Sequence, residues 1–135
     1  MGMYTELIFG ASIKKDAPQK VINTLHYLVN HKKLWEDVEI EESVSNGRNV
    51  LNGSSSYYFG VNDPVAKMWQ DNIDKEWKVC SRCNIKNYEG EIETFLEWVK
   101  PYIDSGSGSR DMYAIKIYEE QSEPTIYYLH DDDEQ

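Results

Sequence analysis

Cys80 and Cys83 are the first residues to consider for chemistry, because two cysteines separated by two residues can bind a metal or exchange a disulfide. Residues 76–86 alternate between apolar and polar side chains, which is the period of a β-strand with one buried face. Residues three apart on a strand point to opposite faces. We therefore predict one buried thiol and one surface thiol, with no metal and no cofactor at this pair.

The other nucleophilic and ligating side chains do not form a recognisable catalytic set. His26, His31 and His130 do not follow the spacing of metal ligands, and the serines at 54–56 lack the pattern of a nucleophile elbow. The chain has no Walker loop, no dinucleotide-binding glycine motif and no zinc-protease motif. We predict no catalytic residues and a non-enzymatic protein.

Charge is the strongest chemical signal in the composition. The chain of 135 residues has 24 Asp and Glu against 14 Lys and Arg, a net charge of −10. Such a field disfavours direct binding to a nucleic-acid backbone and steers a basic protein partner toward the surface. One acidic cluster follows the first predicted helix, and a second lies near the C-terminus. The first cluster consists of Glu36, Asp37, Glu39, Glu41 and Glu42.

Aromatic residues are more numerous than the predicted core can bury. The sequence contains ten Tyr and four Trp, and these two types are enriched in protein interfaces. We therefore expect an acidic protein-binding module, with an inhibitor of a basic partner as the leading hypothesis, of the phage anti-defence or toxin-immunity kind. The aromatic candidates for its contact surface are Tyr57, Tyr58, Trp69, Tyr127 and Tyr128.

A row of basic residues supports an alternative function. Lys78, Arg82 and Lys86 lie on the polar face of the predicted strand 76–86, where they could bind a small anion or a nucleotide. The simpler interpretation is that these side chains pair with acidic residues of neighbouring strands. A thermal-shift screen with nucleotides and other anions would distinguish the two hypotheses, because a ligand that binds only the native state raises its stability.

The elements that must position these residues follow from the hydrophobic periods. Residues 88–103 place their apolar side chains on one side of a helix, and Asp16 with Gln19 fits a capping box for an earlier helix. Residues 63–69 indicate a short turn of helix at best. We predict strands at 4–14, 56–61, 76–86, 112–119 and 125–129, and helices at 16–29 and 88–103.

This order predicts an α+β fold. The succession β-α-β-β-α-β-β is that of a ferredoxin-like split βαβ unit with one added strand. It implies an antiparallel sheet with both helices on one face and the other face open. The expected order of strands across the sheet is 125–129, 112–119, 4–14, 76–86 and 56–61. This fold hosts many unrelated activities, so it does not select a function.

Length and composition indicate a single domain. We expect residues 1–130 to form it and residues 131–135 to be an acidic disordered tail. No apolar run is long enough to span a bilayer, and residues 1–10 do not resemble a secretory leader. Two cysteines are too few for a disulfide framework, which suits a reducing compartment. We therefore expect a cytoplasmic protein of a bacterial host, with no membrane partner.

Two segments carry a resemblance to other proteins. The run NIKNYEGEIETFLEWVKPYI at 84–103, followed by RDMYAIKIYEEQSEPTIYY, resembles a pattern in small bacterial and phage proteins that have no assigned function. The opening YTELIFGASIKKD is similar as well. The resemblance implies a compact α+β domain and a phage or mobile-element origin, and it transfers no catalytic residue.

Overall fold

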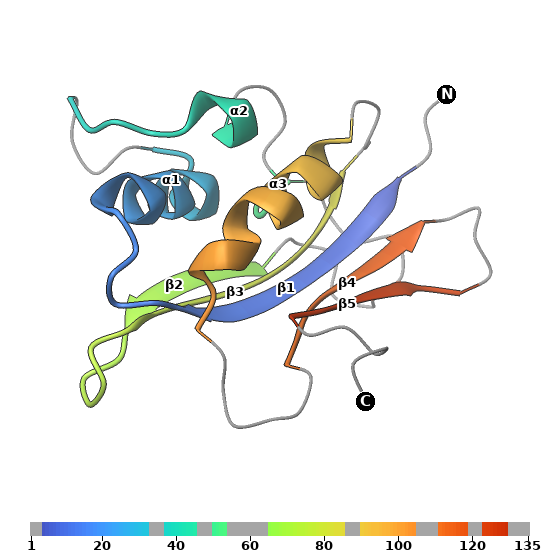
Figure 1. Cartoon of the computed structure of the whole chain (residues 1–135). Coiled ribbons are helices and arrows are strands. Elements are labelled where there is room, and N and C mark those ends of the chain that lie inside the picture. Colours follow the sequence, from blue (N-terminus) through green and yellow to red (C-terminus); the bar gives the residue numbers. More distant parts are fainter. Residues whose placement is uncertain are drawn as a thin grey trace.

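The computed structural model of the chain describes residues 4–32, 37–45, 50–53, 65–85, 90–104, 111–118 and 123–129. Figure 1 shows the helices and strands along these ranges. The elements are β1 (Thr5–Ile13), α1 (Gln19–Asn30), α2 (Glu42–Ser45), β2 (Val65–Gln70), β3 (Trp77–Ile85), α3 (Glu91–Val99), the 3-10 turn η1 (Lys100–Tyr102), β4 (Met112–Tyr118) and β5 (Thr125–Tyr128).

The strands form one five-stranded sheet in the order β2-β3-β1-β4-β5, with every neighbouring pair antiparallel. β1 lies at the centre, between β3 and β4. Helices α1 and α3 cover one face of the sheet (Figure 1). The predicted α+β class, antiparallel sheet and single helical face are therefore confirmed.

The strand beside β3 differs from the prediction. Residues 56–61, the expected second strand, lie outside the described residues, and Val65–Gln70 forms strand β2 where we expected a turn of helix. The specific ferredoxin-like order is therefore not matched. The spacing of Val65, Met68 and Trp69 fits a helical stripe, but a strand that pairs along β3 satisfies more backbone hydrogen bonds than an isolated helical turn.

A tight turn joins β2 to β3 and fixes this pairing. The Asp71 carboxylate accepts hydrogen bonds from the backbone N–H of Ile73 at 2.7 Å and of Asp74 at 3.2 Å. The backbone N–H of Asp71 donates to the carbonyl of Glu76 at 2.9 Å. Lys75 adopts the left-handed conformation, with φ of 65°. These contacts are typical of side-chain-stabilised turns and set the register of the hairpin.

The core fills the space between the sheet and the two helices. Leu7, Phe9 and Ile13 of β1 are fully buried and point to the helical face. Phe9 meets Phe95 of α3 edge to face, with ring centroids 5.1 Å apart. Such aromatic pairs stabilise the fold by about 0.5–1.5 kcal/mol beyond the contribution of the apolar surface that they bury. The predicted inward stripes of both helices are confirmed, and Lys116 of β4 forms an ion pair with Glu93 at the helical side.

The helix ends differ from the predicted caps. The N-cap of α1 is Pro18, without a side-chain capping hydrogen bond, and Asp16 is exposed, so the predicted capping box is wrong. Proline fixes φ near the helical value and lets the Pro18 carbonyl accept the first intrahelical bond, from Val21. His31 ends α1 in the left-handed conformation. α3 begins after Gly90, whose φ is 73°.

None of the helices in the described ranges is long and apolar enough to cross a membrane. Residues 131–135, predicted as an acidic tail, lie outside the described residues.

Candidate protein-binding surface

Residues 37–42 run alongside helix α1, and we call them the acidic strap. Two side chains of α1 hold the backbone of the strap. The Asn23 amide donates to the carbonyl of Glu39 at 3.2 Å, and the backbone N–H of Glu41 donates to Thr24 Oγ1 at 2.8 Å. Asn23 is nearly buried and Thr24 is fully buried. A buried polar side chain that loses its hydrogen-bond partner destabilises the folded state. The strap therefore has a defined position on the helix.

The supporting residues are themselves held in place. Gln19 Nε2 donates to Asn23 Oδ1 at 2.9 Å, which leaves the Asn23 amide nitrogen directed to the strap. Thr24 Oγ1 donates to the carbonyl of Lys20 at 2.7 Å and so uses its lone pair for the N–H of Glu41. Val38 of the strap is buried as well.

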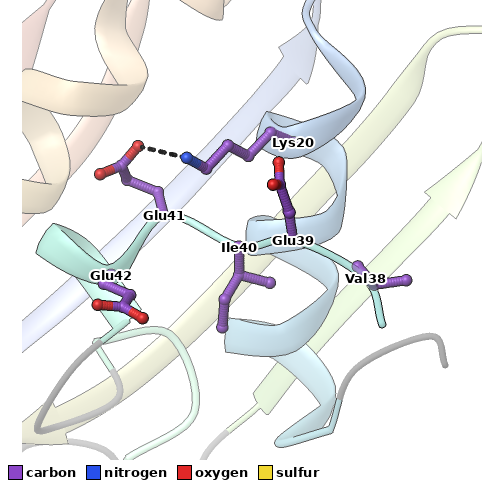
Figure 2. Close-up of a pocket in the computed structure, with 6 residues that line it drawn as sticks. All are labelled: Lys20, Val38, Glu39, Ile40, Glu41 and Glu42. Atoms are coloured by element: carbon purple, nitrogen blue, oxygen red, sulfur yellow. Dashed lines mark ion pairs between the residues drawn. The ribbon is translucent and has the colours of Figure 1, made fainter. Parts of the chain in front are cut away.

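The strap and Lys20 line a pocket of about 450 Å³ (Figure 2). Lys20 Nζ lies 3.6 Å from Glu41 Oε1, and both side chains are partly exposed, so this ion pair adds little to stability. Figure 2 shows Glu39 and Glu41 on the Lys20 side and Glu42 at the end where α2 begins. The wall of the pocket also includes the half-buried side chain of Ile40.

The structure brings the predicted acidic cluster together in part. Asp37, Glu39 and Glu42 are exposed, and Glu41 is half-buried beside Lys20. Glu36 lies outside the described residues. Three carboxylates on a fixed strap can accept charge-assisted hydrogen bonds from lysine or arginine side chains of a partner.

The predicted aromatic residues that the structure describes, Trp69, Tyr127 and Tyr128, do not line this pocket. Trp69 lies on β2 opposite Lys78, with 40% of its surface exposed, and Lys67 Nζ lies 5.0 Å from its ring centroid. Tyr127 packs on Tyr113, with centroids 6.2 Å apart, and Tyr128 lies opposite Met112 on the neighbouring strand. Tyr57 and Tyr58 lie outside the described residues.

The basic row of β3 is paired with carboxylates where the structure describes it. Lys78 Nζ lies 3.2 Å from Asp74 and 3.6 Å from Glu76, and it also donates to Ser12 Oγ at 3.0 Å. Arg82 Nη1 lies 3.2 Å from Glu6 Oε2 on the neighbouring strand. Lys86 lies outside the described residues. Pairing with an acid of a neighbouring strand, the simpler expectation, is confirmed for Arg82, whereas the carboxylates beside Lys78 belong to the β2–β3 turn.

The charges around Lys78 shift one another's pKa. The backbone N–H of Glu76 donates to Asp74 and, with Lys78, lowers the pKa of the Asp74 carboxyl. The hydrogen bond to Asp74 raises the pKa of Lys78. A side-chain hydrogen bond with Asp104, burial and the nearby negative charges raise the pKa of Glu76. This end of the sheet is an internally neutralised network and offers little unpaired positive charge to an anion.

The two cysteines lie on opposite faces of β3, as predicted. Cys83 is fully buried in the core, and its thiol donates to the carbonyl of Val50 at 3.0 Å. Burial raises the pKa of the Cys83 thiol to about 11, against a smaller lowering by the backbone N–H of Gly53. Cys80 is exposed. Neither a shared metal nor a disulfide fits this arrangement.

Sequence reasoning missed the residues that hold the strap. Asn23 and Thr24 are buried on α1 outside its apolar stripe, and a buried polar residue must find a hydrogen-bond partner. Because polar residues outside the stripe are expected to face solvent, no pattern in the sequence signals this role. In the described ranges, no three His, Cys, Asp or Glu side chains are grouped so that they could hold a metal ion.

Comparison with known proteins does not assign this chain to a family. No protein-family model, curated protein or solved structure matches this chain.

Proposed function

We propose that this protein is a non-enzymatic acidic module that binds a basic protein partner through the acidic strap. The observation that supports the proposal is the attachment of the strap to α1 through Asn23 and Thr24, with the carboxylates of Glu39 and Glu42 exposed beside a pocket. A contact surface that is already ordered loses less conformational entropy when it binds.

The pocket has the chemistry to receive a long basic side chain. Ile40 offers apolar surface to the methylene groups of a lysine or arginine, while the carboxylates beside it accept hydrogen bonds from the charged end. The net charge of −10 adds a long-range field that accelerates encounter with a basic partner. An inhibitor of a basic nuclease or toxin, of the anti-defence or immunity type, would use these properties.

The proposed fold is a five-stranded relative of the ferredoxin-like arrangement. The register supports it, because β1 and β2 run parallel with β3 between them, and β3 and β4 run parallel with β1 between them. The alternative function, a small-anion or nucleotide site on β3, has less support, because Lys78 and Arg82 already pair with carboxylates.

Titration against a panel of purified basic nucleases and toxins tests the proposal, with a polyarginine peptide as a probe of charge alone. We expect at least one protein to bind with an association rate that falls steeply with salt. The double variant Glu39→Lys and Glu42→Lys should weaken that binding by about tenfold or more.

The matched control changes the same net charge elsewhere. Asp16 and Glu97 are exposed and lie outside the strap, so Asp16→Lys with Glu97→Lys alters the overall field equally. A smaller loss in the control assigns binding to the strap. Equal losses in both variants, or no salt-sensitive binding to any protein of the panel, would contradict the proposal.

A further inference from the structure

The acidic strap crosses α1 in an extended conformation. Residues 38–41 belong to no helix or turn, and Figure 2 shows Glu39 and Glu41 on the side of Lys20 with Ile40 on the other side. Such alternation of side chains is the geometry of a β-strand. The strap therefore has the two backbone edges of a strand, and one of them faces α1.

The edge that faces α1 is occupied. The carbonyl of Glu39 and the backbone N–H of Glu41 are the two groups that Asn23 and Thr24 bond. In an extended chain the backbone groups of successive residues point to opposite edges. The N–H and C=O of Ile40 are therefore directed away from α1, and we call these two groups the outer edge of the strap.

The outer edge has no hydrogen-bond partner in the described part of the chain. Neither backbone group of Ile40 forms a hydrogen bond there, and the half-buried side chain of this residue lines the pocket of about 450 Å³. A partner that covers the strap removes both backbone groups from water. Such a partner must bond them, because a buried and unbonded backbone group weakens the complex.

This requirement selects the conformation of the partner segment. A helix uses its backbone groups internally and would leave the outer edge unbonded, whereas an extended segment has free N–H and C=O groups along its own edge. An antiparallel segment can exchange both hydrogen bonds with Ile40 through a single residue. Addition of a strand in this way is a recurring mode of peptide recognition.

The side chains beside the outer edge select the residues of that segment. In an antiparallel pairing, the residue opposite Ile40 has its side chain on the same face as Ile40, which favours an apolar residue. The following residue lies opposite Glu39, whose exposed carboxylate favours lysine or arginine. Glu41 already pairs with Lys20 and favours an uncharged polar residue opposite it, while the exposed Glu42 favours a second basic residue.

From these observations we infer that the acidic strap binds its partner by strand addition, and that the occupant is an extended, antiparallel segment with the pattern basic, polar, apolar, basic. The apolar residue exchanges two hydrogen bonds with the backbone of Ile40. The first basic residue reaches Glu42 and the second reaches Glu39. The inference rests on the proposed function, since it uses the same surface, and it adds the conformation, direction and residue pattern of the segment that the strap receives.

A short peptide titrated into the full chain tests the inference. The probe has the core Arg-Thr-Val-Arg between flanks of glycine and serine, and binding is followed by nuclear magnetic resonance at low salt. We expect saturable shifts of the Ile40 amide, with a dissociation constant of about 1 mM or tighter. The Ile40 amide should also exchange with solvent at least about tenfold more slowly at saturation. The Glu41 amide, which already donates to Thr24, should be protected in the free protein.

Peptides that differ by one backbone methyl group place the test on single hydrogen bonds. A methyl group on the valine nitrogen removes the donor to the Ile40 carbonyl and should weaken binding by about tenfold or more. A methyl group on the threonine nitrogen is the matched control, because this N–H points away from the strap in the inferred pairing. The control should change the affinity by less than about threefold.

Three results overturn strand addition: equal effects of the two methyl groups, an Ile40 amide that stays unprotected at saturation, and no saturable binding of the probe. The proposed function is judged separately by the double variant Glu39→Lys and Glu42→Lys. If this variant weakens binding of a basic protein while the two methylated peptides bind alike, the proposed function stands and the inference fails. If the variant binds the basic protein as tightly as the wild type does, the proposed function itself fails.

Discussion

Alkylation of Cys83 should be slower in the folded protein than in urea by about three orders of magnitude. Cys83 is fully buried, and burial raises its pKa to about 11. At pH 8 a thiol with that pKa is about 0.1% ionised, whereas an ordinary thiol with pKa near 8.5 is about a quarter ionised. Ionisation alone therefore slows the reaction by roughly 200-fold, and the lack of access slows it further.

The remaining route is reaction through transient opening. If exposing the core of β3 costs about 5 kcal/mol or more, the open population is below about one in a thousand. The thiol has an ordinary pKa in that open state, so opening sets the upper limit of the rate. The two routes give the same order of magnitude.

Mass spectrometry after timed alkylation measures the effect. The Cys80→Ser variant isolates Cys83, and its own rate in urea provides the reference for an unhindered thiol. A folded Cys80→Ser protein that is alkylated within tenfold of the rate in urea would refute the assignment of Cys83 to the core face of β3. It would also refute the cause given for its raised pKa.

Four further substitutions test the structure. Gly90→Ala should lower the free energy of unfolding by about 1–2 kcal/mol, because φ of 73° strains any residue with a Cβ. Gly10→Ala, measured by urea unfolding at dilution, should instead raise the free energy of unfolding by about 0.4–1 kcal/mol, because the added Cβ meets no atom within 4 Å. Thr24→Val removes the acceptor of the Glu41 N–H and should cost about 1–2 kcal/mol and increase amide exchange in the strap. Glu76 has a raised pKa, so the folded state holds its proton more tightly and stability should rise as pH falls toward 4.5; Glu76→Gln should flatten that rise in pH-dependent urea unfolding.

The parts of the fold that were predictable from the sequence have a strong local period. Apolar and polar residues alternate in the sequence of β3 because one face meets the core, although Asn84 on the other face is buried as well, and the stripe of α3 repeats because one side of the helix meets the core. The prediction for residues 63–69 was wrong because Val65, Met68 and Trp69 have the spacing of one side of a helix, whereas in strand β2 Met68 points to the core and Val65 and Trp69 point to the other face. Only the hydrogen bonds to β3, which no local pattern reveals, decide between the two.

The negative charge of the candidate site was predictable from the sequence, but the α1 residues that hold the acidic strap were not. The acidic residues at 36–42 are visible as a cluster in the chain, and this cluster is the basis of the hypothesis of a basic partner. Asn23 reaches a carbonyl 16 residues later, and such a contact depends on how the chain returns over α1. The separation of the aromatic candidates from the strap likewise depends on which strands are neighbours.

The central position of β1 has a consequence for how the chain acquires its structure. β1 precedes the other strands of this sheet in the chain, yet its partners are β3 and β4, and Phe9 lies opposite Ser81 on one side and Ala114 on the other. Pairings between distant segments slow folding, since the intervening chain must be ordered first. The nascent N-terminal strand must therefore keep its apolar side chains from other chains until the last third of the protein emerges, and we expect slow, late and all-or-none acquisition of the sheet.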